Sequence, residues 1–362
     1  MEAGQAVGRL DGVATTLPNM DLLVLMYIRA EAVLSSQIEG TQASLDDVLR
    51  AEVNLQEPGD ASDVQEVINY IAALNYGLGR INALPVSLRL IRELHNELMA
   101  GVRGGQRDPG EFRRTQNWIG SAGATLQTAR FVPPPVPEMQ AALDNLEKFI
   151  YEDASALPPL LKVGLLHAQF ETIHPFLDGN GRTGRLLMTL LLCHYGLLRL
   201  PLLYLSHYFM LHRSEYYDRL QAVRERGDWE GWLHFFLTGV RLVAEESTAK
   251  TREILTLREA HRALLGRELG RRAGKGLAVL EHLYQQPYIS VRVAQRLTDQ
   301  TYASANSLVA DLVAYGILQP VGERQRDRVF AYQPYLEVFQ LGLSAPAQAA
   351  PDEATRSESE RQ

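Results

Sequence analysis

A thirteen-residue stretch, residues 173–185, constrains the fold of this chain more than any other segment. It reads IHPFLDGNGRTGR and precedes an apolar run, residues 186–192, that is typical of a buried helix. Its glycines allow the backbone to turn tightly and to approach a ligand closely, where a Cβ atom would clash. The stretch therefore predicts a sharp loop that leads directly into the first turn of a buried helix.

The polar residues of this stretch are suited to binding a polyphosphate. The start of a helix offers free backbone N–H groups and the positive end of the helix dipole, so Gly179, Asn180 and Gly181 are predicted to contact phosphate oxygens. Arg182 and Arg185 are three residues apart on the first turn and could each bind a further phosphate group through paired N–H donors. The pattern thus predicts an anion site at the start of the helix.

Two further residues of the stretch indicate chemistry at this site. Asp178 only accepts hydrogen bonds when ionised, so beside phosphates it is better explained as a Mg²⁺ ligand than as a phosphate contact. His174 can accept a proton near neutral pH, as a hydroxyl that attacks phosphorus requires. A calcium-binding loop is disfavoured, because Thr183 and Thr189 stand where its turn glycine and bidentate glutamate would be.

Residues 174–185 resemble the signature of the Fic family, HxFx(D/E)GNGRxxR, and match it at every fixed position. The resemblance implies a mainly α-helical Fic domain that transfers AMP from ATP to a Ser, Thr or Tyr hydroxyl of a target protein and releases pyrophosphate. It implies that His174 is the general base and that Asp178 binds the Mg²⁺ cofactor. The residues that it implies for ATP binding are Gly179, Asn180, Gly181, Arg182, Thr183, Gly184, Arg185 and, for the adenine pocket, Tyr217.

A second segment, near residue 39, suggests regulation. Helical spacing of apolar residues predicts a helix over 20–39 that stops at Gly40. Ser35 and Glu39 share one face of it, and a carboxylate at a helix C-terminus is disfavoured unless a cation pairs with it. Taken alone, Glu39 could equally be a solvated side chain. However, SSQIEG resembles the inhibitory signature of the Fic family, (S/T)xxxE(G/N), which implies that Glu39 pairs with Arg185 at the place of the ATP γ-phosphate.

Residues 110–123 break the helical pattern and lead to a proline run at 133–135. Turn-forming glycines and β-forming residues predict a short hairpin here, whose edge could bind an extended peptide. On the residues alone, an ordinary surface hairpin would explain the pattern. The resemblance implies a flap that aligns the target hydroxyl, formed by Asn117, Trp118, Ile119 and Gly120.

The remaining helical patterns predict a mainly α chain with several modules. Their helices are expected over 44–52, 62–78, 87–100, 136–153, 160–172, 214–224 and 244–271. His95 and His167 lie on such helices and are interpreted as structural. The expected division is an N-terminal helical module with the inhibitory helix (1–85), a Fic catalytic domain (86–243), a linker helix (244–272), a winged-helix-like domain (273–340) and a disordered tail (341–362).

The function of the last module stays open at the level of sequence. Its three expected helices and a basic turn with Arg324, Arg326 and Arg328 resemble a winged helix, which can bind DNA. Its third helix has no Lys or Arg and carries Asp311, so protein docking or formation of a homodimer is at least as good an explanation. The formal net charge of −7 also argues against a general nucleic-acid binder.

Other features of the sequence indicate a cytoplasmic protein that does not cross a membrane. The single cysteine, Cys193, excludes an intrachain disulfide, and the longest apolar run, near 186–198, is shorter than a membrane span. Two alternative functions remain. Glu39 could position a water that removes AMP from modified targets, or the last module could bind DNA as a regulator. The selectivity for the nucleotide base is also undecided.

Overall fold

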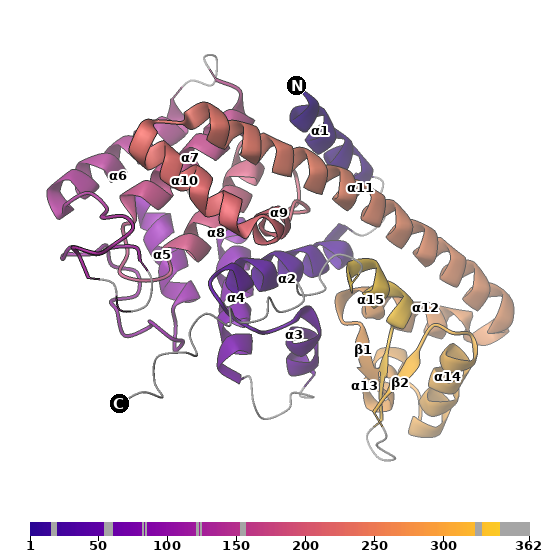
Figure 1. The fold of residues 1–362 in the computed structure, drawn as a ribbon. Coiled ribbons are helices and arrows are strands. Elements are labelled where there is room, and N and C mark those ends of the chain that lie inside the picture. The colour runs from indigo at the N-terminus through magenta and orange to yellow at the C-terminus, as the bar shows by residue number, and fades with distance from the viewer. Residues whose placement is uncertain are drawn as a thin grey trace, which may run out of the picture.

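The computed structural model describes residues 1–15, 20–53, 61–81, 83, 85–120, 123, 125–152, 157–322 and 328–340, with only the backbone described for residues 20–23 and 340. Within these ranges the chain is mainly α-helical with one small antiparallel sheet, as the sequence predicts (Figure 1). None of the helices in the described part combines the length and apolar character that a membrane crossing needs. The tail after residue 340, Arg324 and Arg326 lie outside the described residues.

The first two helices pack against different parts of the molecule. Helix α1 (Glu2–Ala14), which the sequence patterns did not predict, packs along the long helix α11 (Trp229–Glu268) (Figure 1). Helix α2 (Met20–Ile38) packs against α4, α9 and α12 at the centre of the molecule. It ends because Gly40 takes a backbone φ of +103°, a value that favours glycine, while the Ser36 carbonyl accepts bonds from the N–H groups of Glu39 and Thr41.

A bundle of helices surrounds α8 (Asn180–His194), which is buried along nearly its whole length. Helix α7 (Pro159–Ile173) precedes it and crosses it closely, because Gly184 allows contact with Phe170 and Glu171. The other helices of this part of the chain are α3 (Leu45–Glu52), α4 (Ala61–Arg80), α5 (Leu88–Leu98), α6 (Val136–Tyr151), α9 (Ser206–Leu211) and α10 (Arg213–Arg226). The loop within the IHPFLDGNGRTGR stretch, residues 174–179, therefore joins two packed helices.

The linker helix begins fifteen residues earlier than predicted. Residues 244–271 were expected to form it, but α11 is one continuous helix of 40 residues that starts at Trp229. Asp228 caps its start by accepting a bond of 3.0 Å from the Gly231 N–H, and Trp232 and Phe236 extend its apolar face into the catalytic bundle. The two halves of the helix have different surroundings, so the sequence becomes polar beyond residue 244. This change of composition suggested a separate helix where one helix continues.

The last module has the element order that the sequence suggests. Three helices, α12 (Ala273–Gln285), α13 (Val291–Thr298) and α14 (Tyr302–Ala314), are followed by strands β2 (Gln319–Val321) and β3 (Val329–Ala331). An additional short strand, β1 (Tyr288–Ser290), makes the sheet order β1-β3-β2, with Phe330 opposite both Ile289 and Pro320. A final helix, α15 (Gln333–Gln340), packs on α11. Its assignment as a winged helix stays a prediction.

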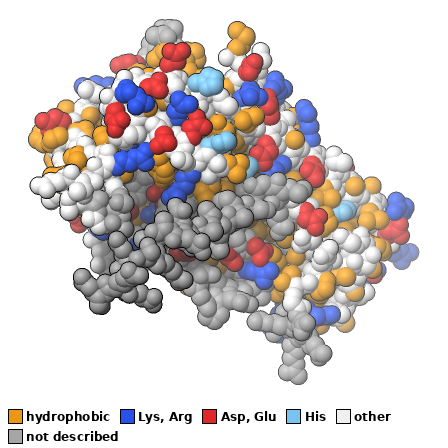
Figure 2. All heavy atoms as spheres, viewed as in Figure 1, with side chains coloured by type: hydrophobic (Ala, Val, Ile, Leu, Met, Phe, Trp, Pro, Cys, Tyr) orange, Lys and Arg blue, Asp and Glu red, His pale blue; other side chains and the backbone are white. Residues whose placement is uncertain are grey.

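Two charged side chains of this module have partners close by. Asp311 pairs with Arg272 at 2.8 Å, and Arg328 donates to Asn306 at 3.0 Å. Figure 2 shows basic and acidic side chains interspersed over the face of the molecule drawn there. Among the described side chains on that face, the charges are of both signs.

The last module is fastened to α2 and α3 by a buried arginine. Arg29 lies on α2 and donates to both carboxylate oxygens of Glu52, at 2.9 and 2.7 Å, and to the backbone carbonyl of Gln285 at 2.8 Å. Glu52 also accepts from the Gln286 amide at 2.8 Å, and the Tyr288 hydroxyl donates to Asp46. A buried guanidinium with three oxygen acceptors thus joins α2 and α3 to the distant helix α12.

Removing this arginine should destabilise the protein markedly. We expect Arg29→Ala to lower the free energy of unfolding by about 3 kcal/mol, because it removes the cation that pairs with Glu52 and the donor to the Gln285 carbonyl. Urea unfolding at neutral pH measures the loss. Arg89→Ala is the control, since Arg89 is exposed and pairs with Glu93 on the surface, so it should cost less than about 1 kcal/mol. Equal losses in the two variants would contradict this account.

Candidate active site

His174 ends α7 in a backbone conformation that few non-glycine residues adopt. Its φ and ψ are 50° and 60°, in the left-handed region. Its N–H donates to the Phe170 carbonyl at 3.0 Å, and its own carbonyl accepts from Arg113 Nε and Asn117 Nδ2, each at 3.1 Å. These bonds hold the strained residue and direct the chain from α7 into the loop.

Asn180 closes the loop with its side chain. Its Oδ1 accepts from the Phe176 N–H and its Nδ2 donates to the Phe176 carbonyl, both at 2.8 Å. Gly179, at φ +74°, then begins α8. Because the Asn180 side chain is used in this way, the groups left for an anion at this turn are backbone N–H donors of the first turn, which have no partner inside the helix.

His95 supports the same loop from α5. Its Nδ1 accepts from the Gly110 N–H at 2.9 Å, so its Nε2 carries the proton and donates to the Asp178 carbonyl at 3.0 Å. The ring stacks on Phe176 with a centroid distance of 3.7 Å. Burial lowers the pKa of His95 to about 4, which keeps it neutral. The sequence showed a histidine on a helix face but no signal for this supporting role.

The structure places Glu39 directly against Arg185. Arg185 Nη2 donates to Glu39 Oε1 at 2.6 Å and to the Ser35 carbonyl at 3.0 Å, while its Nε donates to Ser35 Oγ at 2.9 Å. Burial alone would raise the pKa of Glu39, but Arg185, Arg182 and His174 together lower it. A Cβ atom on Gly181 would collide with the Glu39 carboxylate, which therefore lies over the first turn of α8.

Arg182 has a different environment from Arg185. Its Nη1 lies 3.1 Å from Glu66 Oε2 in a buried ion pair, and Thr41 donates to the same oxygen at 2.9 Å. This pair links α8 to α4 and to the segment after α2. The predicted phosphate role of Arg182 stays a prediction. Sequence reasoning missed Glu66 because helical spacing alone gives no partner for a residue 116 positions away.

A cavity of about 660 Å³ lies in front of His174, a size typical of ligand pockets. Of the predicted site residues it brings together Glu39, Trp118, Ile119, Gly120, His174, Gly181, Arg185 and Tyr217. Arg130, Arg213 and Arg224 also line it and were not predicted. The described lining does not include the other predicted ATP- and metal-binding residues, which are Asp178, Gly179, Asn180, Arg182, Thr183 and Gly184. The Thr183 hydroxyl donates to the Gly179 carbonyl at 2.9 Å, and Gly184 faces α7.

The cavity holds His174 in the form that a general base needs. Burial, helped by the charges of Arg224 and Arg113, lowers the pKa of His174 to about 4, although Glu39 and the Glu171 backbone oppose this shift. The imidazole is therefore neutral near pH 7 and can accept a proton. Arg224 also stacks over the Phe131 ring, which connects this charge to the base of the predicted flap.

The predicted hairpin is reduced to one bridge in the described residues. Ile119 and Phe131 exchange backbone bonds of 2.8 and 3.1 Å, without a longer ladder. Asn117 anchors this segment, because its Nδ2 donates to the carbonyls of His174 and Phe176. Trp118 is 44% exposed at the cavity mouth. The side chain of Asn117 is thus an anchor, and the next three residues face the cavity.

The role of Asp178 as a Mg²⁺ ligand stays a prediction. The carboxylate is partly exposed, its Oδ1 accepts from the Gly179 N–H at 2.7 Å, and its Oδ2 lies 3.8 Å from Arg107 Nη1. No group of three His, Cys, Asp or Glu residues in the described part of the chain could enclose a metal. One carboxylate combined with substrate phosphates is an arrangement that Mg²⁺ commonly uses.

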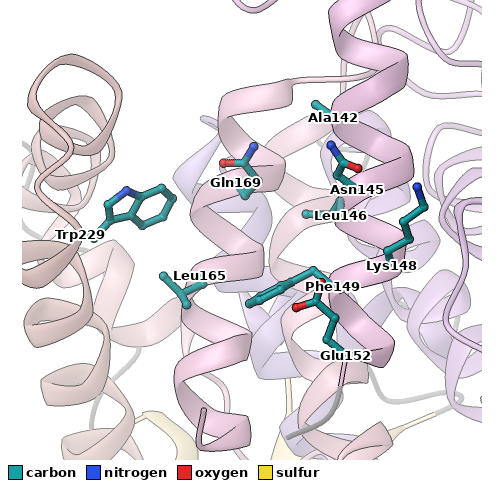
Figure 3. A pocket seen from close by; sticks show the side chains of 9 residues that line it. All are labelled: Ala142, Asn145, Leu146, Lys148, Phe149, Glu152, Leu165, Gln169 and Trp229. Atoms are coloured by element: carbon teal, nitrogen blue, oxygen red, sulfur yellow. The ribbon is translucent and has the colours of Figure 1, made fainter. Parts of the chain in front are cut away.

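Another hollow, of about 490 Å³, lies between α6, α7 and the start of α11 (Figure 3). Its lining includes Phe149, Leu165 and Trp229 with the polar tips of Lys148 and Gln169. It contains none of residues 173–185, so it is separate from the cavity at His174.

Two family profiles match this chain. The profile of the Fic/DOC family N-terminal region matches residues 1–79, and that of the Fic/DOC family matches residues 85–192. The chain belongs to the Fic/DOC family. The Fic profile covers the whole IHPFLDGNGRTGR stretch, and the N-terminal profile covers Ser35 and Glu39.

Named relatives of this Fic chain match part of it. It is 33% identical over 176 residues to the protein adenylyltransferase Fic of Drosophila grimshawi, covering 46% of this chain and 32% of that protein. It is 31% identical over 208 residues to the same-named protein of Culex quinquefasciatus, covering 55% and 37%. The chain thus spans about a third of the length of these curated relatives.

Solved Fic structures share the fold. A Fic family protein from Desulfovibrio desulfuricans matches with a TM-score of 0.59 at 18% identity, over 91% of this chain and 93% of that one. Fic-1 from C. elegans matches with a TM-score of 0.51 at 19% identity, over 69% and 72%. The first match extends over almost the whole Fic chain, so the arrangement of its helices is common to both proteins.

His95 should make the stability of the protein sensitive to acid. Its folded pKa lies below the ordinary value, so its contribution is present above about pH 6.5 and is lost as the pH falls through about 4. His95→Phe removes this contribution and leaves the Gly110 N–H and Asp178 carbonyl unpaired, at a cost of about 2–4 kcal/mol at pH 7.

Urea unfolding of both proteins at pH 7, 5.5 and 4 measures the difference. The gap between them should narrow with falling pH, with a slope of at most about 1.4 kcal/mol per pH unit for one proton. A gap that stays constant between pH 7 and 4 would show that the proton on His95 is not linked to folding.

Proposed function

We propose that the protein is an autoinhibited protein adenylyltransferase, which transfers AMP from ATP to a Ser, Thr or Tyr hydroxyl of a target protein and releases pyrophosphate. The observation that carries this proposal is the position of the Glu39–Arg185 ion pair. It lies over the first turn of α8 and inside the same cavity as the neutral imidazole of His174. A base, an anion site and a carboxylate that competes for that site are therefore adjacent.

His174 would accept the proton of the target hydroxyl as its oxygen attacks the α-phosphorus in line. The first-turn N–H groups of α8 would hold phosphate oxygens, and Arg185 would bind the outer phosphate. Asp178 would hold Mg²⁺, which supplies charge neutralisation to the phosphates when it is bound. Catalysis then depends on positioning and on electrostatic stabilisation, which suits a site with one base and several anion-binding groups.

The mode of inhibition follows from the bonds of Arg185. A γ-phosphate and the Glu39 carboxylate are both anions that require the same guanidinium, so they exclude each other. Ser35 holds Nε and shares Nη2 independently of Glu39. Loss of the Glu39 carboxylate would therefore leave Arg185 oriented toward the cavity with a free donor. Inhibition of this kind depends on one side chain.

The target hydroxyl would reach His174 past the flap segment. Trp118, Ile119 and Gly120 line the cavity, and Asn117 ties their backbone to the carbonyl of His174. Because Asn117 connects this segment to His174, a peptide bound along it would have a fixed position with respect to His174. The name of the curated relatives, protein adenylyltransferase, supports the same chemistry.

Labelling with ATP that carries the label on the α-phosphate tests the proposal. With Mg²⁺, Glu39→Gly should label itself or proteins of a host lysate at least about 10-fold more strongly than wild type, because an outer-phosphate contact to a buried arginine contributes more than about 1.4 kcal/mol. His174→Ala in the same background should abolish the label. Mass spectrometry should find an added AMP on a hydroxyl residue.

Glu225→Gln serves as the control, because Glu225 is an exposed carboxylate on α10 that contacts Gln221. It should label as weakly as wild type. Absence of label in Glu39→Gly would contradict the proposed inhibition. If wild type instead releases AMP from labelled targets and Glu39→Gly does not, Glu39 acts with a water and the protein removes AMP.

A further inference from the structure

In addition to Glu39, a second carboxyl group, that of Glu171, lies close to the proposed base on its Nδ1 side. Glu171 lies three residues before His174 on α7, is 5% exposed, and contributes to the cavity wall. Its Oε2 is 3.9 Å from His174 Nδ1. Oε1 of Glu171 has no hydrogen-bond partner among the described residues, and Nδ1 of His174 has no side-chain partner there. Two polar atoms that usually require a partner are thus buried close to each other.

The packing of α8 makes room for this carboxyl group. Gly184 lies against Glu171 Oε1, and a Cβ atom at position 184 would occupy the space of that oxygen. The backbone carbonyl of Glu171 already accepts from Arg224 Nη2 at 2.9 Å. The same carbonyl also acts as a hydrogen-bond acceptor toward the His174 ring, which raises the pKa of His174. The carboxyl group is therefore a second acceptor beside the imidazole.

Charges from each surrounding element act on the pair. Arg185 comes from α8, Arg224 from α10, Arg113 from the flap segment and Glu39 from the segment after α2. Burial raises the pKa of Glu171 to about 7, although Arg185 and Arg224 oppose it, while burial lowers that of His174 to about 4. Near neutral pH the carboxyl group is thus partly ionised beside a neutral ring.

We propose that Glu171 is a positioning residue for His174: its carboxylate accepts the Nδ1–H of the imidazole, which leaves the Nε2 lone pair for the target hydroxyl. This inference rests on the proposed role of His174 as the base. A movement of about 1 Å would shorten the 3.9 Å separation to a hydrogen bond. The same carboxylate then faces the positive charge that forms on the ring.

The hydroxyl proton passes to Nε2 while the oxygen forms a bond to the α-phosphorus and the bond to pyrophosphate breaks. The ring then carries one positive charge, with its Nδ1–H directed at the Glu171 carboxylate, and later releases the proton from Nε2 to water. A carboxylate behind a histidine stabilises such an imidazolium and fixes its tautomer without taking the proton itself.

The first test reads the tautomer of His174 and requires no turnover. Full-length protein with ¹⁵N-labelled histidine is compared by NMR with His174→Ala, which assigns the His174 signals. Wild type at pH 8 should show Nδ1 protonated and Nε2 unprotonated. Glu171→Ala should shift His174 toward the other tautomer, whereas Glu171→Gln, whose amide oxygen can still accept, should retain it.

The second test measures catalysis in the Glu39→Gly background. Glu171→Gln should lower kcat by about 10- to 100-fold while KM for ATP changes by less than about 2-fold, because the lost charge acts on the proton transfer and not on nucleotide binding. The rise of kcat with pH should also change its midpoint. Glu225→Gln is the matched control and should leave kcat and its pH profile unchanged.

A role in stability alone would give a different pattern. Since Glu171 must ionise while buried, Glu171→Gln should unfold at the same or a higher urea concentration than the parent at pH 8. An unchanged His174 tautomer in Glu171→Ala together with an unchanged kcat in Glu171→Gln overturns the inference. If Glu39→Gly transfers no AMP, the proposed function fails, while the NMR result still decides whether Glu171 positions His174.

Discussion

The burial of one guanidinium determines much of this structure. Arg185 is 1% exposed, and a charge in such a place is stable only if carboxylate and hydrogen-bond acceptors surround it. Ser35 and Glu39 supply them from the end of α2, a helix that is 146 residues away in sequence. Helix α2 must therefore lie against α8, and α4, α9 and α12 pack around it in turn. The N-terminal module and the catalytic loop are in this way linked through Arg185, and the last module is joined to α2 by Arg29.

A layer of residues behind the loop explains how the site keeps its shape. His95, Arg113, Asn117 and Asn180 all bond to backbone atoms between His174 and Asp178 or to the turn that follows. Backbone groups in a buried loop need such partners, because they have neither a helix nor a sheet to satisfy them. The strained conformation of His174 is retained because several independent contacts hold it.

The sequence was sufficient for the local features of the site and for the mainly α fold. The order of glycines and apolar residues predicted the loop and the buried helix. The helical phase placed Ser35 and Glu39 on one face, and the resemblance to the Fic family implied Arg185 as the partner of Glu39. It could not give the pairing of Arg182 with Glu66 or the role of His95, because those contacts join distant segments that only packing brings together.

Element boundaries were the other limit of sequence reasoning. Helices α1 and α9 and strand β1 were not predicted, and the start of α11 was placed at residue 244 instead of Trp229. Short elements give few repeats of a pattern, and a helix that passes from a buried to an exposed environment changes its pattern midway. The expected domain limits, the cytoplasmic location and the homodimer stay predictions.

Helix α11 also restricts how this chain can be shortened or recombined. Forty residues in a continuous helix extend about 60 Å, and this length serves the catalytic bundle at its start and the last module at its end. Its buried positions continue through Ile254, and α1 packs along it. A chimaera in which the chain is replaced from residue 244 onward would therefore also lose part of the helix on which α1 packs. A module swap that preserves the fold has its junction beyond Ile254.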